Sequence, residues 1–195
     1  LGCGLQTGAG TVMNVFRLKK GQSLAVFGTG SVGLAAVMAA KASGAGLIIG
    51  VDIVPKRLKL ALKLGATHAI DSRSKDVAGR IMEITGRGVD FTLETTGSLE
   101  LGRASREILA GGGIAADAIG ASGEGALPGG RRAVSIIQGD SVPQRFIPQL
   151  IGLYKKGLFP FDRLIRFYRF TEVNRAVAAS RAGSVIKPVI TFGKE

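Results

Sequence analysis

The sequence predicts an α/β fold: a doubly wound parallel sheet of six strands with a C-terminal helical appendage. Three observations predict it. Short apolar runs alternate with helix-forming runs along most of the chain, glycines punctuate the junctions, and one glycine-rich turn joins the first strand to the first helix. Such alternation is typical of parallel strands connected by helices, with ligands bound at the carboxyl ends of the strands. We expect residues 1–195 to form a single domain, because no low-complexity linker interrupts them.

The elements follow from composition, spacing and helix signals. Residues 1–10 are glycine-rich and predict a loop, and residues 11–18 have helical spacing, so that 1–20 form a connector and entry helix. Pro55 suits the first turn of a helix that Gly65 ends. The expected strands are residues 23–27, 47–51, 67–70, 90–95, 114–119 and 134–138. The expected helices between them are residues 31–43, 55–64, 76–85 and 99–109.

The last part of the chain is less regular. Residues 122–130 have the composition of a loop. The C-terminal part, residues 141–195, is expected to contain two helices and an end strand; in order, these are a helix at 141–156, a turn at 157–160, an extended piece at 164–167, a helix at 171–182 and a strand at 185–192.

The glycine-rich turn has the spacing of a phosphate-binding loop. Gly28 permits a tight turn, Gly30 lets the backbone approach a pyrophosphate, and Gly33 allows the new helix to pack closely on the strand. The helix then presents its N-terminal N–H groups and the positive end of its dipole to the phosphates. Because the chain has 30 glycines, the triplet alone is weak; its position between a strand and a helix strengthens it.

An acidic residue completes the pattern. Asp52 ends the second predicted strand, 52 − 28 = 24 positions after the first glycine. A carboxylate at this place accepts hydrogen bonds from the adenosine ribose hydroxyls and repels a 2′-phosphate. The sequence therefore predicts a Rossmann-type domain that binds NAD rather than NADP.

Charge and composition exclude several other classes. The net charge of +12 suggests a polyanion partner, but aromatic residues make up only 6% and no groove-reading motif accompanies the cations. These cations are scattered: Arg17, Lys19, Lys20, Lys56, Arg57, Arg131, Arg132, Arg163, Arg166 and Arg169. We expect no nucleic-acid partner and, without a long uncharged apolar run, no membrane partner. The single cysteine suits a reducing cytoplasm, where we expect the protein.

Few side chains offer catalytic chemistry. Tyr154 and Tyr168 are followed four positions later by Leu158 and Glu172, so neither forms the Tyr–Lys pair of short-chain dehydrogenases. His68 is the only histidine and is interpreted as structural. A lone cysteine is most often a small buried apolar residue. Cys3 instead lies in the run CGLQTGAG, about twenty residues before the glycine turn.

These blocks resemble the zinc-containing medium-chain alcohol dehydrogenases, most closely the aryl and benzyl alcohol dehydrogenase branch. The resemblance covers the whole chain. Its segments are the GCG-x-x-TG opening, AVFGTGSVGLAAVMAAK, VDIVPKRL, LGATHAI, GVDFTLETTG, GDSVPQRFIPQLIGLYKKGLFPFDRLI and IKPVITF. Several of these segments are longer than a generic Rossmann signature.

The resemblance implies roles for individual residues. Cys3 would be a thiolate ligand of a catalytic zinc ion, and Thr7 would contact the nicotinamide. Asp52, assisted by Arg57, would bind the adenosine ribose. The remaining implied cofactor-binding residues are Gly28, Thr29, Gly30, Ser31, Val32 and Gly33 of the phosphate turn, Thr96 and Gly97 after the fourth strand, Ile119 and Gly120 after the fifth, and Lys187 at the pyrophosphate.

The resemblance also implies the reaction. Zinc would act as a Lewis acid on an alcohol oxygen, and a hydride would pass from the carbinol carbon to the nicotinamide. A catalytic zinc ion needs about three protein ligands, and this chain supplies only Cys3. The others would come from an N-terminal catalytic domain that these residues lack, so we expect no catalytic residue and no turnover in this chain alone.

Two departures from the family stand out. Residues 121–130 are shorter than the family's stretch, which supplies part of the subunit interface, so a homo-oligomer is left open. Asp117 places a charge inside a predicted buried strand, and the sequence offers no reason for it.

The sequence therefore predicts the NAD(H)-binding domain of a zinc-dependent alcohol dehydrogenase that oxidises primary alcohols, aromatic ones among the candidates, to aldehydes. The small-molecule alcohol would bind in the full-length enzyme. The alternative is a stand-alone dinucleotide-binding module for sensing or interaction, without catalysis. A basic nucleic-acid binder is a third interpretation, and it predicts binding to duplex DNA that depends steeply on salt.

Overall fold

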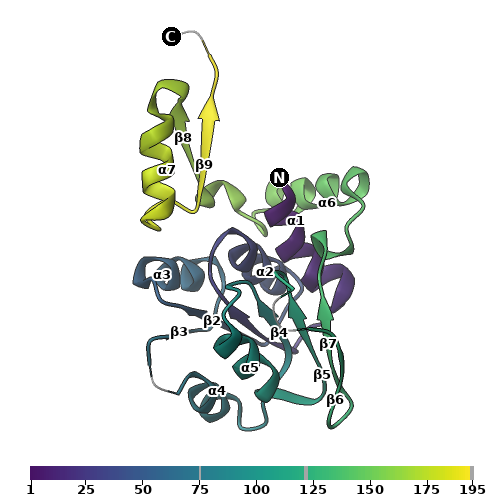
Figure 1. Ribbon diagram of the computed structural model, residues 1–195. Coiled ribbons are helices and arrows are strands. Elements are labelled where there is room, and N and C mark those ends of the chain that lie inside the picture. Colours follow the sequence, from purple (N-terminus) through teal and green to yellow (C-terminus); the bar gives the residue numbers. More distant parts are fainter. Residues whose placement is uncertain (75, 121–122, 194–195) are drawn as a thin grey trace. The chain divides into compact units, whose positions relative to one another are not determined.

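A computed structural model describes residues 1–74, 76–120 and 123–193, and it divides the chain into two compact units, Leu1–Phe159 and Pro160–Glu195. Figure 1 follows the chain through both units. The sequence placed the start of the C-terminal part at residue 141, whereas the structure keeps helix α6 (Pro143–Lys155) in the first unit. Within the described residues, no helix is both long enough and apolar enough to span a membrane.

The first unit is built on a seven-stranded sheet. Its strands are β1 (Ser23–Phe27), β2 (Leu47–Asp52), β3 (His68–Asp71), β4 (Val89–Glu94), β5 (Leu109–Asp117), β6 (Gly125–Leu127) and β7 (Arg131–Ser135). Their spatial order is β3-β2-β1-β4-β5-β7-β6. All neighbours are parallel except the antiparallel pair of β6 and β7. The doubly wound parallel sheet predicted from the alternating pattern is confirmed.

Two pairs of helices cover this sheet. After β1 and β2 come α2 (Ser31–Ala42) and α3 (Pro55–Leu64), which pack against each other. The connections from β3 to β4 and from β4 to β5 carry α4 (Val77–Thr85) and α5 (Leu99–Glu107), which also contact each other. Right-handed crossovers place the two pairs on opposite faces, because the strand order reverses at β1 (Figure 1). The reversal leaves a crevice at the carboxyl ends of β1 and β4.

The apolar sequence of the central strands explains their position. Every residue of β1 is buried, and Phe27 is fully enclosed. A continuous cluster extends from it under α4 and α5; its buried members are Ala25, Phe27, Ile49, Val51, Ile70, Val77, Ile81, Val89 and Ile108. Parallel strands buried on both faces read as apolar runs rather than alternating ones, which is why these strands were recognisable.

The prediction of a loop at residues 1–10 is wrong. Residues Cys3–Gly10 form helix α1, and Thr11–Val15 continue it as a π-helical turn, η1. A Cβ at Gly8 would overlap the carbonyl oxygen of Val32 and crowd Ala35, so this glycine marks a close approach of α1 to α2. The glycines that suggested a loop therefore serve helix packing.

The sheet's far edge also differs from expectation. β5 runs over Leu109–Asp117 rather than 114–119, and β7 over Arg131–Ser135 rather than 134–138. The seventh strand, β6, lies within the expected loop 122–130, of which residue 122 is outside the described residues. With the three residues Gly-Ala-Leu, β6 is too short to show a strand period. A short 3₁₀ turn, η2 (Gln138–Asp140), follows β7.

The second unit is a small α/β element. After η3 (Phe161–Leu164) come β8 (Ile165–Arg169), η4 (Phe170–Glu172), α7 (Val173–Arg181) and β9 (Lys187–Thr191). β8 and β9 pair in parallel, and Tyr168, Ala176 and Val185 form a buried cluster between sheet and helix. The extended piece expected at 164–167 and the strand expected at 185–192 correspond to β8 and β9, and the structure adds that the two pair as a small sheet (Figure 1).

Candidate functional site

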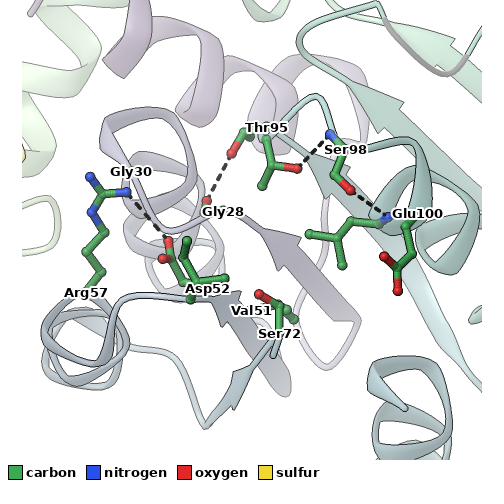
Figure 2. A pocket seen from close by; sticks show the side chains of 12 residues that line it. Gly28, Gly30, Val51, Asp52, Arg57, Ser72, Thr95, Ser98 and Glu100 are labelled. Atoms are coloured by element: carbon green, nitrogen blue, oxygen red, sulfur yellow. Dashed lines mark hydrogen bonds and ion pairs between the residues drawn. The ribbon is translucent and has the colours of Figure 1, made fainter. Parts of the chain in front are cut away.

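The crevice where the strand order reverses contains a cavity of about 510 Å³ (Figure 2). It lies at the carboxyl ends of the strands, where polar side chains and the N-termini of helices converge. Five of the residues predicted from the sequence line it: Gly28, Gly30, Asp52, Arg57 and Thr96. Seven further residues also line it: Val51, Ile53, Ser72, Thr95, Ser98, Glu100 and Leu101.

Each glycine of the turn has a different environment. Gly28 has a φ of +89°, which favours glycine, and a Cβ there would overlap the hydroxyl oxygen of Thr95. A Cβ at Gly33 would overlap the carbonyl oxygen of Gly28, so the first turn of α2 packs directly on the glycine turn. Gly30 is the opposite case, because a Cβ there would meet no atom within 4 Å. The turn is therefore tight at Gly28 and Gly33 and open at Gly30.

Helix α2 begins directly at this open position. Gly30 is its N-cap with an extended backbone, and no side chain caps it by a hydrogen bond. The N–H groups of the first turn of a helix have no intrahelical partner, and the helix dipole adds positive potential there. At this place the crevice offers a site for an anion.

Asp52, the last residue of β2, lies at the glycine turn and is only 6% exposed. Its Oδ2 accepts hydrogen bonds from the backbone N–H of Thr29 at 2.7 Å and from the Thr29 hydroxyl at 2.9 Å. Its Oδ1 accepts the N–H of Val54 at 2.9 Å. The carboxylate therefore ties the residue between the first two glycines to the end of β2.

Arg57 balances the charge of this carboxylate. Its Nη1 lies 4.0 Å from Asp52 Oδ2, and its side chain is 26% exposed. Its Nε is buried and has no hydrogen-bond partner among the described residues. Figure 2 shows Arg57 and Asp52 on one side of the Gly28 turn and Thr95 on the other.

The strands β4 and β5 end in the same manner as β2. Glu94 is 1% exposed and accepts the N–H groups of Thr96 at 2.7 Å and Gly97 at 2.9 Å. Asp117 is 4% exposed, and its Oδ1 accepts the N–H groups of Ile119 at 2.8 Å and Gly120 at 2.9 Å. Each buried carboxylate therefore organises the turn that follows its strand. This arrangement accounts for the charge at Asp117 that the sequence left unexplained.

The other predicted residues lie on several elements. Ser31 and Val32 begin α2, and Thr7 lies on α1, where its carbonyl accepts the Thr11 hydroxyl. A Cβ at Gly4 would be 3.2 Å from the Ser31 hydroxyl oxygen, which places the start of α1 beside the start of α2. Lys187 begins β9 in the second unit and pairs with Ile165.

Comparison with known proteins gives the family. Residues 31–128 match the family described as zinc-binding dehydrogenases. The chain belongs to the zinc-binding dehydrogenase family. It is 42% identical over 201 residues to a geraniol dehydrogenase of Castellaniella defragrans, covering 98% of this chain and 54% of that protein. The resemblance drawn from the sequence is thereby confirmed.

Solved structures of zinc-binding dehydrogenases are also similar to this chain. The benzyl alcohol dehydrogenase of Acinetobacter calcoaceticus superposes with a TM-score of 0.93 at 42% identity, covering 98% of this chain and 55% of that one. A zinc-binding-domain alcohol dehydrogenase of Burkholderia ambifaria gives 0.94 at 48% identity, covering 100% of this chain and 55% of that one. This zinc-binding dehydrogenase chain thus spans about half the length of the relatives it matches.

The family name implies a zinc ion, and the described residues supply few candidate ligands for one. Cys3 is exposed and free. Across residues 1–74, 76–120 and 123–193, no three His, Cys, Asp or Glu side chains gather as a metal site. Because a catalytic zinc ion needs about three protein ligands, the residues present do not by themselves fit one.

Sequence reasoning missed several residues that line the crevice, and Thr95 is the most informative of them. Its hydroxyl donates toward the carbonyl oxygens of Phe27 at 2.9 Å and Gly28 at 3.0 Å. The signal available was its place at the carboxyl end of a strand adjacent to the glycine turn. That adjacency depends on the pairing of β1 with β4, which only the folded structure shows.

Proposed function

We propose that this chain is the NAD(H)-binding domain of a zinc-dependent alcohol dehydrogenase that oxidises primary alcohols, aromatic ones among the candidates, to aldehydes by hydride transfer. The observation that supports it best is the arrangement at the crevice: Gly30 faces open space at the uncapped start of α2, while Asp52 holds the neighbouring residue Thr29. A helix start would bind the pyrophosphate of a dinucleotide, and a carboxylate at the end of the next strand would bind its ribose.

The diphosphate would bind at the start of α2. The helix-start N–H groups would donate to the phosphate oxygens, and the absence of a side chain at Gly30 would let the phosphates come close. Any Cβ at Gly30 would project into this approach. The tight contacts at Gly28 and Gly33 would keep the helix start in place.

The adenosine ribose would bind at Asp52. A carboxylate has about four lone-pair positions, and the three donors from Thr29 and Val54 leave one of them, on Oδ1, for a ribose hydroxyl. A 2′-phosphate would bring a second negative charge to a nearly buried carboxylate, which disfavours NADP. Arg57, at 4.0 Å from the carboxylate, offsets part of this charge.

The bound nicotinamide would supply hydride transfer, and the chain's contribution is to bind and orient it. The relatives support the substrate class, since geraniol and benzyl alcohol are both primary alcohols. The zinc ligands other than Cys3 would have to come from residues outside this chain.

Calorimetry with NADH and NADPH tests the cofactor half of the proposal. We expect the chain to bind NADH more tightly than NADPH by about tenfold or more, because like charges placed together are costly. Equal affinity for both would remove Asp52 from its proposed role, and no binding of either would contradict the proposal.

A turnover assay tests the second half. We expect the chain supplied with NAD, zinc and benzyl alcohol to produce no NADH, because it offers a single candidate zinc ligand. Steady production of NADH would show that this chain carries a complete active site and would contradict its proposed role as the cofactor domain.

A further inference from the structure

The peptide unit between Gly28 and Thr29 is held from two different strands. Its N–H, which belongs to Thr29, donates to Asp52 Oδ2 on β2 at 2.7 Å. Its carbonyl, which belongs to Gly28, lies 3.0 Å from the hydroxyl of Thr95 at the end of β4. The N–H and C=O of a trans peptide point in opposite directions, so these two contacts together determine the orientation of its plane.

The backbone at Gly28 depends on such hydrogen bonds for its orientation more than the backbone of a residue with a side chain does. Its φ of +89° and its lack of a Cβ mean that its own sterics restrict the backbone little. Its N–H donates to the carbonyl of Val51 at 2.8 Å, which ties the preceding peptide to β2. On the β4 side, Thr95 donates from its N–H to the Phe27 carbonyl at 2.9 Å, and its single hydroxyl proton is shared between the carbonyls of Phe27 at 2.9 Å and Gly28 at 3.0 Å. Both peptides flanking Gly28 are therefore constrained.

The glycine turn also determines the position of the first turn of α2. The carbonyl oxygen of Gly28 lies directly against Gly33, where no Cβ would fit. The plane of the Gly28–Thr29 peptide therefore influences where the first helical N–H groups point. Figure 2 shows the Thr95 side chain reaching Gly28 from the side opposite to Asp52.

We propose that Thr95 is a positioning residue for the diphosphate of the bound dinucleotide. Its hydroxyl holds the Gly28 carbonyl, and the turn then keeps the N–H groups at the start of α2 aimed at the phosphates. Thr95 acts through Gly28, whose carbonyl its hydroxyl contacts. This inference rests on the proposed binding of NAD(H) by the same crevice.

Thr95→Val tests the inference, because it replaces the hydroxyl by a methyl group of similar shape. Thr95→Ser keeps the hydroxyl and is the rescue variant. Thr92→Val is the matched control: Thr92 lies on β4, the strand that Thr95 directly follows, is fully buried, and its hydroxyl has no hydrogen-bond partner among the described residues. Affinities for NADH and for adenosine, which lacks the diphosphate, are measured for each variant by calorimetry and ligand-observed NMR.

We expect Thr95→Val to weaken NADH binding about tenfold, the typical effect of one lost hydrogen bond, while its affinity for adenosine stays within about twofold. Thr95→Ser and Thr92→Val are expected to bind NADH within about twofold of the unsubstituted chain. If Thr95→Val does not fold, Thr95→Cys replaces it with the same expected results, because a thiol is a weak donor.

Unchanged NADH affinity in Thr95→Val overturns this inference alone, and so does an equal loss of NADH and adenosine binding, which indicates general damage to the crevice. Failure of Thr95→Ser to restore binding also overturns it. If the unsubstituted chain does not bind NADH, the proposed function fails and this inference falls with it.

Discussion

The carboxylate of Asp52 accepts both the backbone N–H and the hydroxyl of Thr29, at 2.7 and 2.9 Å. Thr29 lies between Gly28 and Gly30 and is fully buried. The acid at the end of β2 therefore holds the glycine turn even without a ligand. Under the proposed function, the same side chain would also select the cofactor.

Asp52→Asn should change both the stability of the glycine turn and the preference for NADH over NADPH. The three donors from Thr29 and Val54 approach both carboxylate oxygens. In asparagine one of these oxygens is replaced by an NH₂ group, which is a donor and therefore cannot accept the N–H or hydroxyl that faces it. We expect a loss of about 1–3 kcal/mol in the free energy of unfolding, measured with urea, and a fall in the preference for NADH over NADPH.

Asp71→Asn is the control for this change. Asp71 pairs with Asp52 in the parallel register of β2 and β3 but is more exposed. We expect it to lower the free energy of unfolding less than Asp52→Asn does, because the Asp71–Arg73 ion pair is exposed and screened by solvent. Equal losses in the two variants would contradict the special role of Asp52.

A comparison of Gly30→Ala with Gly33→Ala should separate an effect on NADH binding from an effect on the stability of the folded chain. A methyl group at Gly30 meets no atom within 4 Å, so we expect an unchanged melting temperature and weaker NADH binding. A methyl group at Gly33 overlaps the Gly28 carbonyl, so we expect both properties to fall, with a loss of about 1–3 kcal/mol in the free energy of unfolding.

Gly152→Ala provides a helical control, since a methyl group there also meets no atom within 4 Å. It should leave NADH binding unchanged and stabilise α6 by about 0.5–1 kcal/mol. NADH binding by Gly30→Ala that equals this control would count against the open position of Gly30 as the phosphate approach.

Gly8→Ala tests the contact between α1 and α2. The added methyl group would overlap the Val32 carbonyl oxygen and crowd Ala35, so we expect a loss of about 1–3 kcal/mol in the free energy of unfolding. Gly4→Ala is the control on the same helix, because its methyl group meets the Ser31 hydroxyl at 3.2 Å and that side chain can move. A stable Gly8→Ala variant would show that the two helices separate without cost.

Asp71 should titrate at unusually low pH. Hydrogen bonds from the Arg73 side chain, at 2.9 and 2.5 Å, and from its backbone lower the pKa of Asp71 from 3.8 to about 2. Because the folded state favours the ionised form, this contribution to stability is complete above about pH 4 and is lost as the pH falls toward 2.

NMR titration of the Asp71 carboxyl group measures this directly. In Arg73→Ala the midpoint should return toward 3.8, because the side-chain hydrogen bonds are its largest cause. A midpoint near 3.8 in the unsubstituted chain would contradict the expected effect of Arg73.

Much of the fold was predictable because the first two strands of the sheet are mainly apolar. The runs ending at Phe27 and Asp52 need burial on both faces, and only a sheet covered by helices provides it. The first helix was not predictable in the same way. Composition cannot distinguish a glycine that permits a turn from one that permits close packing, and Gly8 is of the second kind.

The candidate site also has one part that the sequence predicts and another that only the folded structure reveals. The amino-acid order alone determined the turn Gly28–Gly33 and the acid 24 positions after Gly28, because these lie in one continuous strand–helix–strand segment whose spacing is local. The pairing of β1 with both β2 and β4 was decided only by the tertiary structure. That pairing brings Thr95 to Gly28 across 67 residues of sequence, and it buries Glu94 and Asp117 where they bind the amides of their own turns. Such contacts follow from the order of strands in the sheet, which non-local burial of apolar surface selects and no local pattern encodes.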